Sequence, residues 1–247
     1  MTVQTDEELQ RLRRIGKIVG MTLQEMRKHV RPDITTAELD EIGAKVLAAH
    51  GARSAPIITY DFPGTTCISV NNVAAHGIPG DLVIQKGDMV NLDVSAELDG
   101  YFADAALTVL VRPVPTIKDK LVKCAQLALK KGLGVARAGT PINQIGRTYE
   151  SVAGRFGLNI IKDLPGHGIG RGLHEDPTIP GFYVKEMKRR LQAGMVITLE
   201  PFISAGSGHV VELDDGWTLK TTDGSLCCQF EHTIVVTKGR PIILTAA

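Results

Sequence analysis

Two kinds of hydrophobic spacing follow one another along the chain. Apolar residues that recur every three or four positions are typical of amphipathic helices, and alternation with polar residues is typical of half-buried strands. The first kind predicts helices over about 6–29, 36–50 and 117–137, and a fourth that begins at Thr140-Pro141. The second kind predicts extended segments at about 66–71, 88–97, 101–111, 159–163, 195–203, 217–221 and 227–237.

The predicted elements repeat, because two helices precede a group of strands and two more helices then precede further strands. This order predicts an α/β fold of the α+β kind, built as one domain over residues 1–247 from halves of about 1–112 and 113–247. The segments 87–93 and 193–200 are also alike, since each is a short apolar strand that ends in one carboxylate. This likeness favours an internal duplication, although strand composition alone would also explain it.

A predicted hairpin carries two aspartates. Asp99-Gly100 is a strong signal for a two-residue hairpin turn. With the turn centred there, Ser95 faces Asp104 across the ladder, and Asp93 lies diagonally from Asp104 on the same face. Two unpaired carboxylates on an otherwise apolar face would repel each other and be costly to bury, and a bound cation removes both costs. The alternative is a hairpin whose polar residues face solvent.

The composition is that of an ordinary globular protein, with 43% hydrophobic residues, 22% charged residues and a formal net charge of +1. Near-neutral charge gives no support to the binding of nucleic acid or a membrane surface. The start of the chain is charged and amphipathic, with a capping pattern at Thr5–Glu8, so we expect no secretory signal. No run of about 18 apolar residues suggests a membrane span. Four cysteines without a regular spacing fit reduced thiols in a cytoplasmic protein: Cys67, Cys124, Cys227 and Cys228.

The second half of the chain offers three further candidate ligands. Glu200 ends an apolar strand, and Glu231 lies on a strand whose alternation places Gln229 and Thr233 on the same face. His167 lies in a run that holds four glycines, and glycine lets the backbone approach a ligand closely. The alternative for this run is a flexible loop with incidental histidines.

With the hairpin aspartates, these residues make a set of four carboxylates and one imidazole: Asp93, Asp104, His167, Glu200 and Glu231. Such a set suits two divalent ions that share carboxylates, with Mn, Co, Fe and Zn all suitable. Four negative charges balance two dications, whereas a single ion would leave an excess of carboxylate charge. The residues therefore predict a two-metal site.

At these residues the sequence resembles the methionine aminopeptidases, specifically the short type I form, over nearly the whole chain. Six motifs occur in order and keep every ligand type: Ala75-His76-Gly77-Ile78-Pro79, Asn91-Leu92-Asp93 with Asp104 eleven residues later, Gly166-His167-Gly168-Ile169-Gly170, Leu173-His174-Glu175-Asp176-Pro177, Leu199-Glu200-Pro201 and Phe230-Glu231-His232-Thr233. The resemblance implies the pita-bread fold, in which two pseudo-symmetric α/β halves clasp a dinuclear metal centre on a curved antiparallel sheet covered by helices.

The resemblance also implies a division of roles among the five ligands. Asp93 would be a terminal ligand of one ion, Asp104 and Glu231 would bridge both ions, and His167 and Glu200 would complete the other. In this family the implied reaction is removal of N-terminal methionine from nascent proteins and peptides, with a preference for a small second residue.

The catalytic residues that the resemblance implies are His76, His174 and Glu200. Two dications would lower the pKa of a bound water, which then attacks the first peptide carbonyl. Glu200 would take a proton from this nucleophile, and His174 would hydrogen-bond the scissile carbonyl. His76 would lie near the amide nitrogen and assist its departure.

The resemblance places six residues at the substrate: Phe62, Cys67, His76, Leu173, His174 and Trp217. A methionine side chain needs an apolar, slightly soft pocket; core packing is the alternative for these residues, above all for Cys67. The run 58–63 departs from the usual tyrosine-histidine-glycine-aromatic-proline run, so Thr59 stands where an aromatic residue is common. Leu173 replaces a frequent phenylalanine. A pocket wall with fewer aromatic residues would select less strictly for the methionine side chain of the substrate.

Three alternatives compete with this interpretation. The aminopeptidase P and prolidase class shares the fold and the ligands, but it usually carries an N-terminal domain and an acidic residue where this chain has His232. Type II methionine aminopeptidases carry a helical insertion, and only 26 positions separate His174 from Glu200. A non-catalytic binding module of the same fold would lose ligands, and this chain keeps them all.

The implied partners are the N-termini of nascent polypeptides, near the ribosome. We expect no direct contact with nucleic acid or with a membrane, and we expect a cytoplasmic monomer. Two divalent ions per chain, drawn from Co, Mn, Fe and Zn, are the expected cofactors.

Overall fold

The computed structural model describes residues 1–246. Helix α1 (Asp6–His29) has the bounds that the hydrophobic spacing predicts, and the Thr5 side chain accepts a hydrogen bond from the backbone N–H of Glu8 at its start. Acidic residues in the first turn and basic residues in the last turn oppose the helix dipole. The apolar face of α1 packs against the second helix and the central hairpin.

Helix α2 (Thr36–Ala49) opens with a full capping box, in which Thr35 and Glu38 each accept a hydrogen bond from the other's backbone N–H. Strand β1 (Arg53–Ser54) leads into a short helix, α3 (Ala55–Tyr60). The sequence pattern did not predict α3, because its six residues are too few to show a helical period.

The predicted hairpin is present as strands β4 (Met89–Leu98) and β5 (Tyr101–Leu110). Both residues of the turn between them have positive φ, 52° and 79°, which suits a two-residue turn that follows the twist of the strands. Ser95 pairs with Asp104, and Asp93 lies two positions from Ser95 on the same strand. The predicted register, with the two aspartates diagonal to each other, is therefore confirmed.

Strand β4 pairs with β5 along its whole length and with β2 (Cys67–Val70) and β1 over parts of its other edge. The second half contains α4 (Thr116–Val135) and α5 (Asn143–Arg155). Its largest sheet is antiparallel, with strands in the order β15 (Ile242–Ile243), β14 (His232–Val235), β9 (Val196–Leu199), β7 (Gly166–Gly168) and β8 (Glu175–Ile179).

Two smaller antiparallel sheets complete the fold. The first contains β6 (Asn159–Ile160), β10 (Phe202–Ser204) and β13 (Cys227–Gln229). The second contains β3 (Val73–Ala75), β11 (Val210–Glu212) and β12 (Leu219–Thr221), and so joins strands from both halves of the chain.

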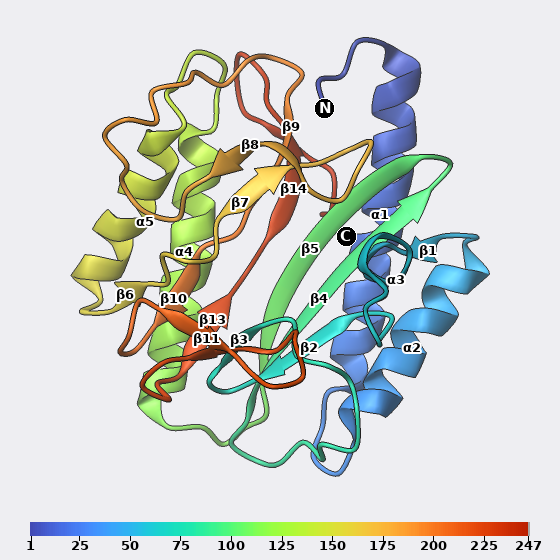
Figure 1. Ribbon diagram of the computed structural model, residues 1–247, viewed down its shortest axis with the longest axis vertical. Coiled ribbons are helices and arrows are strands. Elements are labelled where there is room, and N and C mark those ends of the chain that lie inside the picture. Colours follow the sequence, from blue (N-terminus) through green and yellow to red (C-terminus); the bar gives the residue numbers. More distant parts are fainter. Residues whose placement is uncertain (247) are drawn as a thin grey trace.

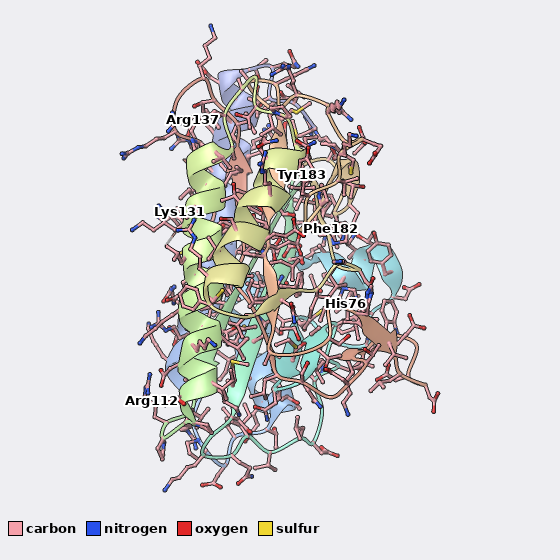
Figure 2. The ribbon with its side chains drawn as sticks, turned by 90° about the vertical axis from the view of Figure 1, so that its left-hand side faces the viewer. His76, Arg112, Lys131, Arg137, Phe182 and Tyr183 are labelled. Carbon is pink, nitrogen blue, oxygen red and sulfur yellow. The ribbon has the colours of Figure 1, made fainter. Side chains whose placement is uncertain are left out.

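The long helices lie on one side of the strands. Figure 1 shows α1 and α2 along one half of the molecule and α4 and α5 along the other. In the side view, α4 and α5 lie along one side of the strands and His76 lies on the other (Figure 2). Each pair of helices covers its own hydrophobic cluster, the first against β4 and β5 and the second against β9, β10 and β14. One face of the strands is thus left for a site.

Hydrogen bonds between β5 and the segment 229–233 join the two halves. The Thr233 hydroxyl donates to the backbone carbonyl of Asp104 (2.7 Å) and accepts from the backbone N–H of the same residue (2.9 Å). The backbone N–H of Glu231 donates to the carbonyl of Ala106 (2.8 Å). An aspartate of the first half is therefore held directly beside a glutamate of the second.

The predicted start of the fourth helix at Thr140-Pro141 is wrong. Helix α5 begins at Asn143, and Ile142 in the capping position makes no side-chain cap hydrogen bond. Thr140 lies in a turn instead, where its backbone N–H donates to Arg137 and its carbonyl accepts from Leu191. Contacts with a distant segment thus override a local capping signal.

Two predicted strands are interrupted. The segment predicted at 195–203 breaks at Glu200-Pro201 into β9 and β10, and the segment predicted at 227–237 breaks at Phe230-Glu231 into β13 and β14. Proline has no N–H for the ladder, so the first break has a direct cause. Each break falls at a glutamate that was predicted to be a ligand.

Two further expectations can be compared with the structure. Among residues 1–246, none of the helices combines the length and the apolar character that a membrane crossing requires. The four cysteines are buried free thiols, and burial raises the pKa of each of them.

Phe182 lies near helix α5 (Figure 2), and Gly146 of this helix packs against its backbone. This contact gives a test of the packing. A Cβ on Gly146 would lie 2.1 Å from the Phe182 carbonyl oxygen. We expect Gly146→Ala to lower the free energy of unfolding by about 1–3 kcal/mol, because the helix must move. On the same helix, a Cβ on Gly154 would meet no atom within 4 Å. Gly154→Ala should therefore raise the free energy of unfolding by about 0.5–1 kcal/mol. Guanidinium denaturation measures the free energy of unfolding of both variants. Equal changes in the two variants would contradict this packing.

Candidate metal centre

The five predicted ligands meet in one cavity of about 560 Å³. They come from five different parts of the strands: β4, β5, β7, the residue after β9 and the break between β13 and β14. Those residues are, in that order, Asp93, Asp104, His167, Glu200 and Glu231.

The ligand atoms lie close enough together to share a metal ion. Nε2 of His167 lies 3.5 Å from Oε1 of Glu200 and 3.9 Å from Oδ2 of Asp104. One ligand atom each from Asp104, His167 and Glu231 fall within 4.8 Å of one another. The hairpin of the first half and the strand break of the second half thus contribute to the same cluster.

Burial raises the pKa of all four carboxyls, because it removes water from their charged forms. The pKa of Asp104 rises to about 6 and that of Glu200 to about 8. Burial also raises the pKa of Asp93 and of Glu231 well above the usual range, and repulsion from the neighbouring carboxylates adds to the effect. The protein alone therefore holds these groups in an environment that disfavours their charge.

Two observations show that a cation fits this environment. Oδ1 of Asp104 and Oε1 of Glu231 are buried and have no hydrogen-bond partner among residues 1–246. Within the same part of the chain, no lysine or arginine lines the cavity. Buried carboxylates are normally paired with a cation or bound to a metal. Since no side chain of the cavity lining supplies the positive charge, a bound metal ion would supply it.

His167 is prepared to act as a ligand through Nε2. Its Nδ1 lies 2.9 Å from the carbonyl oxygen of Gly168, which accepts a hydrogen bond from Nδ1–H and so leaves the lone pair on Nε2. Burial and the neighbouring His174 lower the pKa of His167 to about 4, so the ring is neutral.

Thr198 orients two of the ligands through its hydroxyl group. The sequence did not indicate this role. The Thr198 hydroxyl accepts a hydrogen bond from the backbone N–H of His167 (3.0 Å) and donates to Oε1 of Glu200 (2.6 Å). A buried threonine in an apolar strand gives no signal in the sequence, because only the strand pairing shows where its hydroxyl points.

All six residues predicted at the substrate line the same cavity: Phe62, Cys67, His76, Leu173, His174 and Trp217. Phe62 and Trp217 pack edge to face, with ring centroids 5.2 Å apart. The ring of His174 lies 4.2 Å from that of His167 and therefore beside the carboxylate cluster. Thr59, which stands where an aromatic residue is common in the family, does not line the cavity.

The two predicted catalytic histidines are neutral. Burial lowers the pKa of both His76 and His174, and Glu212 partly opposes this for His76. His76 directly follows β3 with φ of 55°, a conformation that turns the chain sharply. The following Gly77 packs so closely on Ile68 that a Cβ there would lie 2.2 Å from its carbonyl oxygen.

Glu175 holds the loop between His167 and His174 in place through hydrogen bonds to its backbone. The sequence did not reveal this role. One carboxylate oxygen accepts hydrogen bonds from the backbone N–H groups of Arg171 (2.6 Å) and Gly172 (2.7 Å). The other pairs with the terminal ammonium group of Met1. Burial opposes ionisation of Glu175, but these donors outweigh it and lower its pKa. Two of these three partners are backbone groups and the third is distant in the sequence, so no sequence spacing shows them.

Tyr60 was also missed. It is the last residue of α3, it lines the cavity, and its hydroxyl oxygen lies 2.6 Å from Nδ1 of His174. The only signal was indirect, since this residue falls within the run that departs from the family pattern.

Comparison with known proteins agrees with this geometry. The profile of metallopeptidase family M24 matches residues 10–238. Methionine aminopeptidase 2 of Bacillus subtilis is 47% identical over 99% of this chain and 99% of its own length. A methionine aminopeptidase of Staphylococcus epidermidis is 42% identical over 99% of this chain and 98% of its own length.

Solved structures show the same fold. The methionine aminopeptidase of Thermotoga maritima matches with a TM-score of 0.96 at 33% identity over 100% of both chains. That of Rickettsia prowazekii matches with a TM-score of 0.94 at 36% identity over 99% of this chain and all of its own. Prolidase from Pyrococcus furiosus matches with a TM-score of 0.79 at 19% identity, and only 66% of that chain is covered. The present chain therefore has the pita-bread fold and belongs to metallopeptidase family M24, together with the methionine aminopeptidases.

Proposed function

We propose that the protein is a metallo-aminopeptidase that removes the N-terminal methionine from nascent proteins and peptides, with a preference for a small second residue. The observation that carries this proposal is the convergence of Asp93, Asp104, His167, Glu200 and Glu231 on one cavity that also has an apolar wall. The methionine aminopeptidases of similar sequence over the full length support it.

We assign two divalent ions to the cluster, with Co, Mn, Fe and Zn as candidates. Asp93 would hold one ion, and His167 and Glu200 would complete the other. Asp104 and Glu231 would bridge the pair, and each has one buried oxygen without a hydrogen-bond partner among residues 1–246. When bound, such ions supply Lewis-acid activation of the carbonyl and a water of lowered pKa.

The chain's own groups then divide the proton transfers. Glu200 is proposed to take the proton of the attacking water; its Oε1 is already held by the Thr198 hydroxyl, which fixes the orientation of the carboxylate. His174 is proposed to donate a hydrogen bond to the scissile carbonyl, and His76 to lie at the amide nitrogen and assist its departure. Since burial keeps both histidines neutral, each has one N–H to donate and one lone pair to accept.

The wall of the cavity suits a methionine side chain. Phe62 and Trp217 form an aromatic corner, and Cys67 and Leu173 add apolar surface beside it. A flexible thioether packs well against aromatic rings, so this corner would select methionine over charged or short side chains.

The cellular setting follows from the same proposal. Nascent polypeptide N-termini would be the substrates, near the ribosome and in the cytoplasm, and four buried free thiols agree with a reducing compartment. A net charge of +1 gives no reason to propose direct contact with nucleic acid. We propose a monomer that functions as a single catalytic domain over residues 1–247, with pseudo-repeat halves of about 1–112 and 113–247.

Peptide cleavage tests the function and separates it from proline-specific hydrolysis. With Mn²⁺ or Co²⁺ added to the chelated protein, we expect Met-Ala-Ser to be cleaved far faster than Leu-Ala-Ser, Met-Leu-Ser or Ala-Pro-Ser. Asp104→Ala should lower kcat/KM by about a thousandfold or more, as expected for one member of a set that acts as a unit. Asp81 is exposed, so Asp81→Ala is the matched control and should leave kcat/KM unchanged.

Two results would contradict the proposal. No cleavage of any methionyl peptide with any of the four metals would exclude the enzyme, and faster cleavage of Ala-Pro-Ser would point to the proline-specific class. Metal content measured by mass spectrometry should fall in Asp104→Ala and stay constant in Asp81→Ala.

Removal of the metal should change how stability depends on pH. A carboxyl whose folded pKa lies above its unfolded value binds more protons in the folded state, so stability is lost as pH rises toward the folded pKa. In the chelated protein the pKa of Glu200 is about 8, whereas an unfolded glutamate titrates near 4.3. Glu200 alone should therefore lower the free energy of unfolding by about 1 kcal/mol between pH 7 and pH 8, and the raised pKa values of Asp93 and Glu231 add to this fall.

An unfolded histidine (pKa about 6.5) and an unfolded cysteine (pKa about 8.5) also change charge near this window. Burial lowers the pKa of four histidines and raises the pKa of the four cysteines, so the two groups contribute with opposite sign and nearly equally with and without metal. Guanidinium denaturation at pH 7 and pH 8 measures the difference. The metal-loaded protein, whose carboxylates are already ionised, should lack the part of the fall that comes from the carboxyls. The same fall with and without metal would contradict the assignment of the metal to this cluster.

A further inference from the structure

Tyr60 projects from the end of α3 into the cavity, and its exposed fraction is 42%. Its hydroxyl oxygen lies 2.6 Å from Nδ1 of His174, a distance typical of a strong hydrogen bond. The two rings lie 5.5 Å apart between centroids and are tilted by 40°. The contact thus combines a tilted pair of rings with a hydrogen bond at the edge of the imidazole.

The end of α3 is fixed on both sides of Tyr60. At its start, the Ser54 side chain accepts a hydrogen bond from the backbone N–H of Ile57 (3.4 Å). At its end, Asp61 adopts a left-handed conformation (φ 58°), and its backbone N–H donates to the carbonyl of Ile57 (3.0 Å). The next residue, Phe62, is buried in the cavity wall. The backbone on either side of Tyr60 is therefore fixed, and the contact that its hydroxyl makes is the one with His174.

The direction of this hydrogen bond decides which tautomer His174 adopts. Partial burial raises the pKa of the Tyr60 phenol, so the hydroxyl keeps its proton. A neutral phenol is a good donor, and the unprotonated nitrogen of an imidazole is a better acceptor than a phenol oxygen. Donation from the hydroxyl to Nδ1 leaves the imidazole proton on Nε2.

We propose that Tyr60 is a positioning residue for the reaction: its hydroxyl donates to Nδ1 of His174 and holds the Nε2–H toward the cavity, where it can donate to the substrate carbonyl. This inference rests on the role proposed above for His174. In the tyrosine-histidine-glycine-aromatic-proline run given above, histidine stands at the place of Tyr60, so this chain departs from that run at this position.

Tyr60→Phe removes the hydroxyl and keeps the ring, which makes it the direct test in the metal-loaded enzyme. We expect kcat for Met-Ala-Ser to fall about five- to tenfold, the effect of losing one positioned hydrogen bond, with KM within about twofold of wild type. Tyr183→Phe is the matched control, because Tyr183 has a similar exposed fraction (39%), packs its ring against the guanidinium of Arg147 and does not line the cavity. Figure 2 shows Tyr183 away from His76. It should leave both constants unchanged.

The tautomer of His174 provides a readout that does not depend on turnover. In protein labelled with ¹⁵N at histidine, the His174 shifts should show the Nε2–H tautomer in wild type and in Tyr183→Phe, and a mixture of tautomers in Tyr60→Phe. Wild-type His174 in the Nδ1–H form, or the same tautomer in wild type and Tyr60→Phe, would overturn the proposal.

A double-mutant cycle shows whether Tyr60 acts through His174. In a His174→Ala background, adding Tyr60→Phe should cause no further loss of kcat, whereas an equal loss in both backgrounds would overturn the proposal. Metal content and thermal midpoint, measured for every variant, exclude loss of ions or unfolding as the cause. If wild type cleaves no peptide, the proposed function fails, and the ¹⁵N shifts still decide whether Tyr60 sets the tautomer.

Discussion

Four carboxylates meet at one point of this fold, with Asp104 and Glu231 buried and Asp93 and Glu200 half-buried, and among residues 1–246 no lysine or arginine lines the cavity beside them. Such a cluster is costly without a counter-charge, and the raised pKa values of Asp104 and Glu200 express that cost. The rest of the structure is arranged around it. Both halves of the chain must be folded and joined before the cluster exists, so metal binding and the joining of the halves stabilise each other.

The hydrogen bonds between the halves also hold the ligand residues in place. Asp104 lies in the middle of a long strand, and Thr233 hydrogen-bonds its backbone from the second half. Thr198 holds both His167 and Glu200, and Glu175 holds the glycine-rich loop between His167 and His174. Ligands held in this way lose little freedom when an ion binds, which favours tight and specific coordination.

The parts of this arrangement that local rules govern could be predicted from the sequence. Two turn residues set the hairpin register, and with it the diagonal placement of Asp93 and Asp104. The meeting of Asp104 with Glu231 rests on pairing between segments 127 positions apart, which no local rule gives, so only the set of donor residues and the family motifs pointed to it. Tyr60 and Thr198 could not be found, because their roles depend on where their hydroxyls point in the folded chain. The failed helix start near residue 140 has the same origin, a distant contact that overrides a local signal.

The central claim is that this cluster holds two metal ions, shared by Asp104 and Glu231. X-ray diffraction from crystals of the Mn²⁺-loaded protein, recorded at the manganese absorption edge, tests it most directly. The account predicts two anomalous peaks inside the cavity, with Asp104 and Glu231 each in contact with both, and Asp93 at one peak only. A single peak at saturating Mn²⁺, or peaks that lie away from these carboxylates, would contradict it.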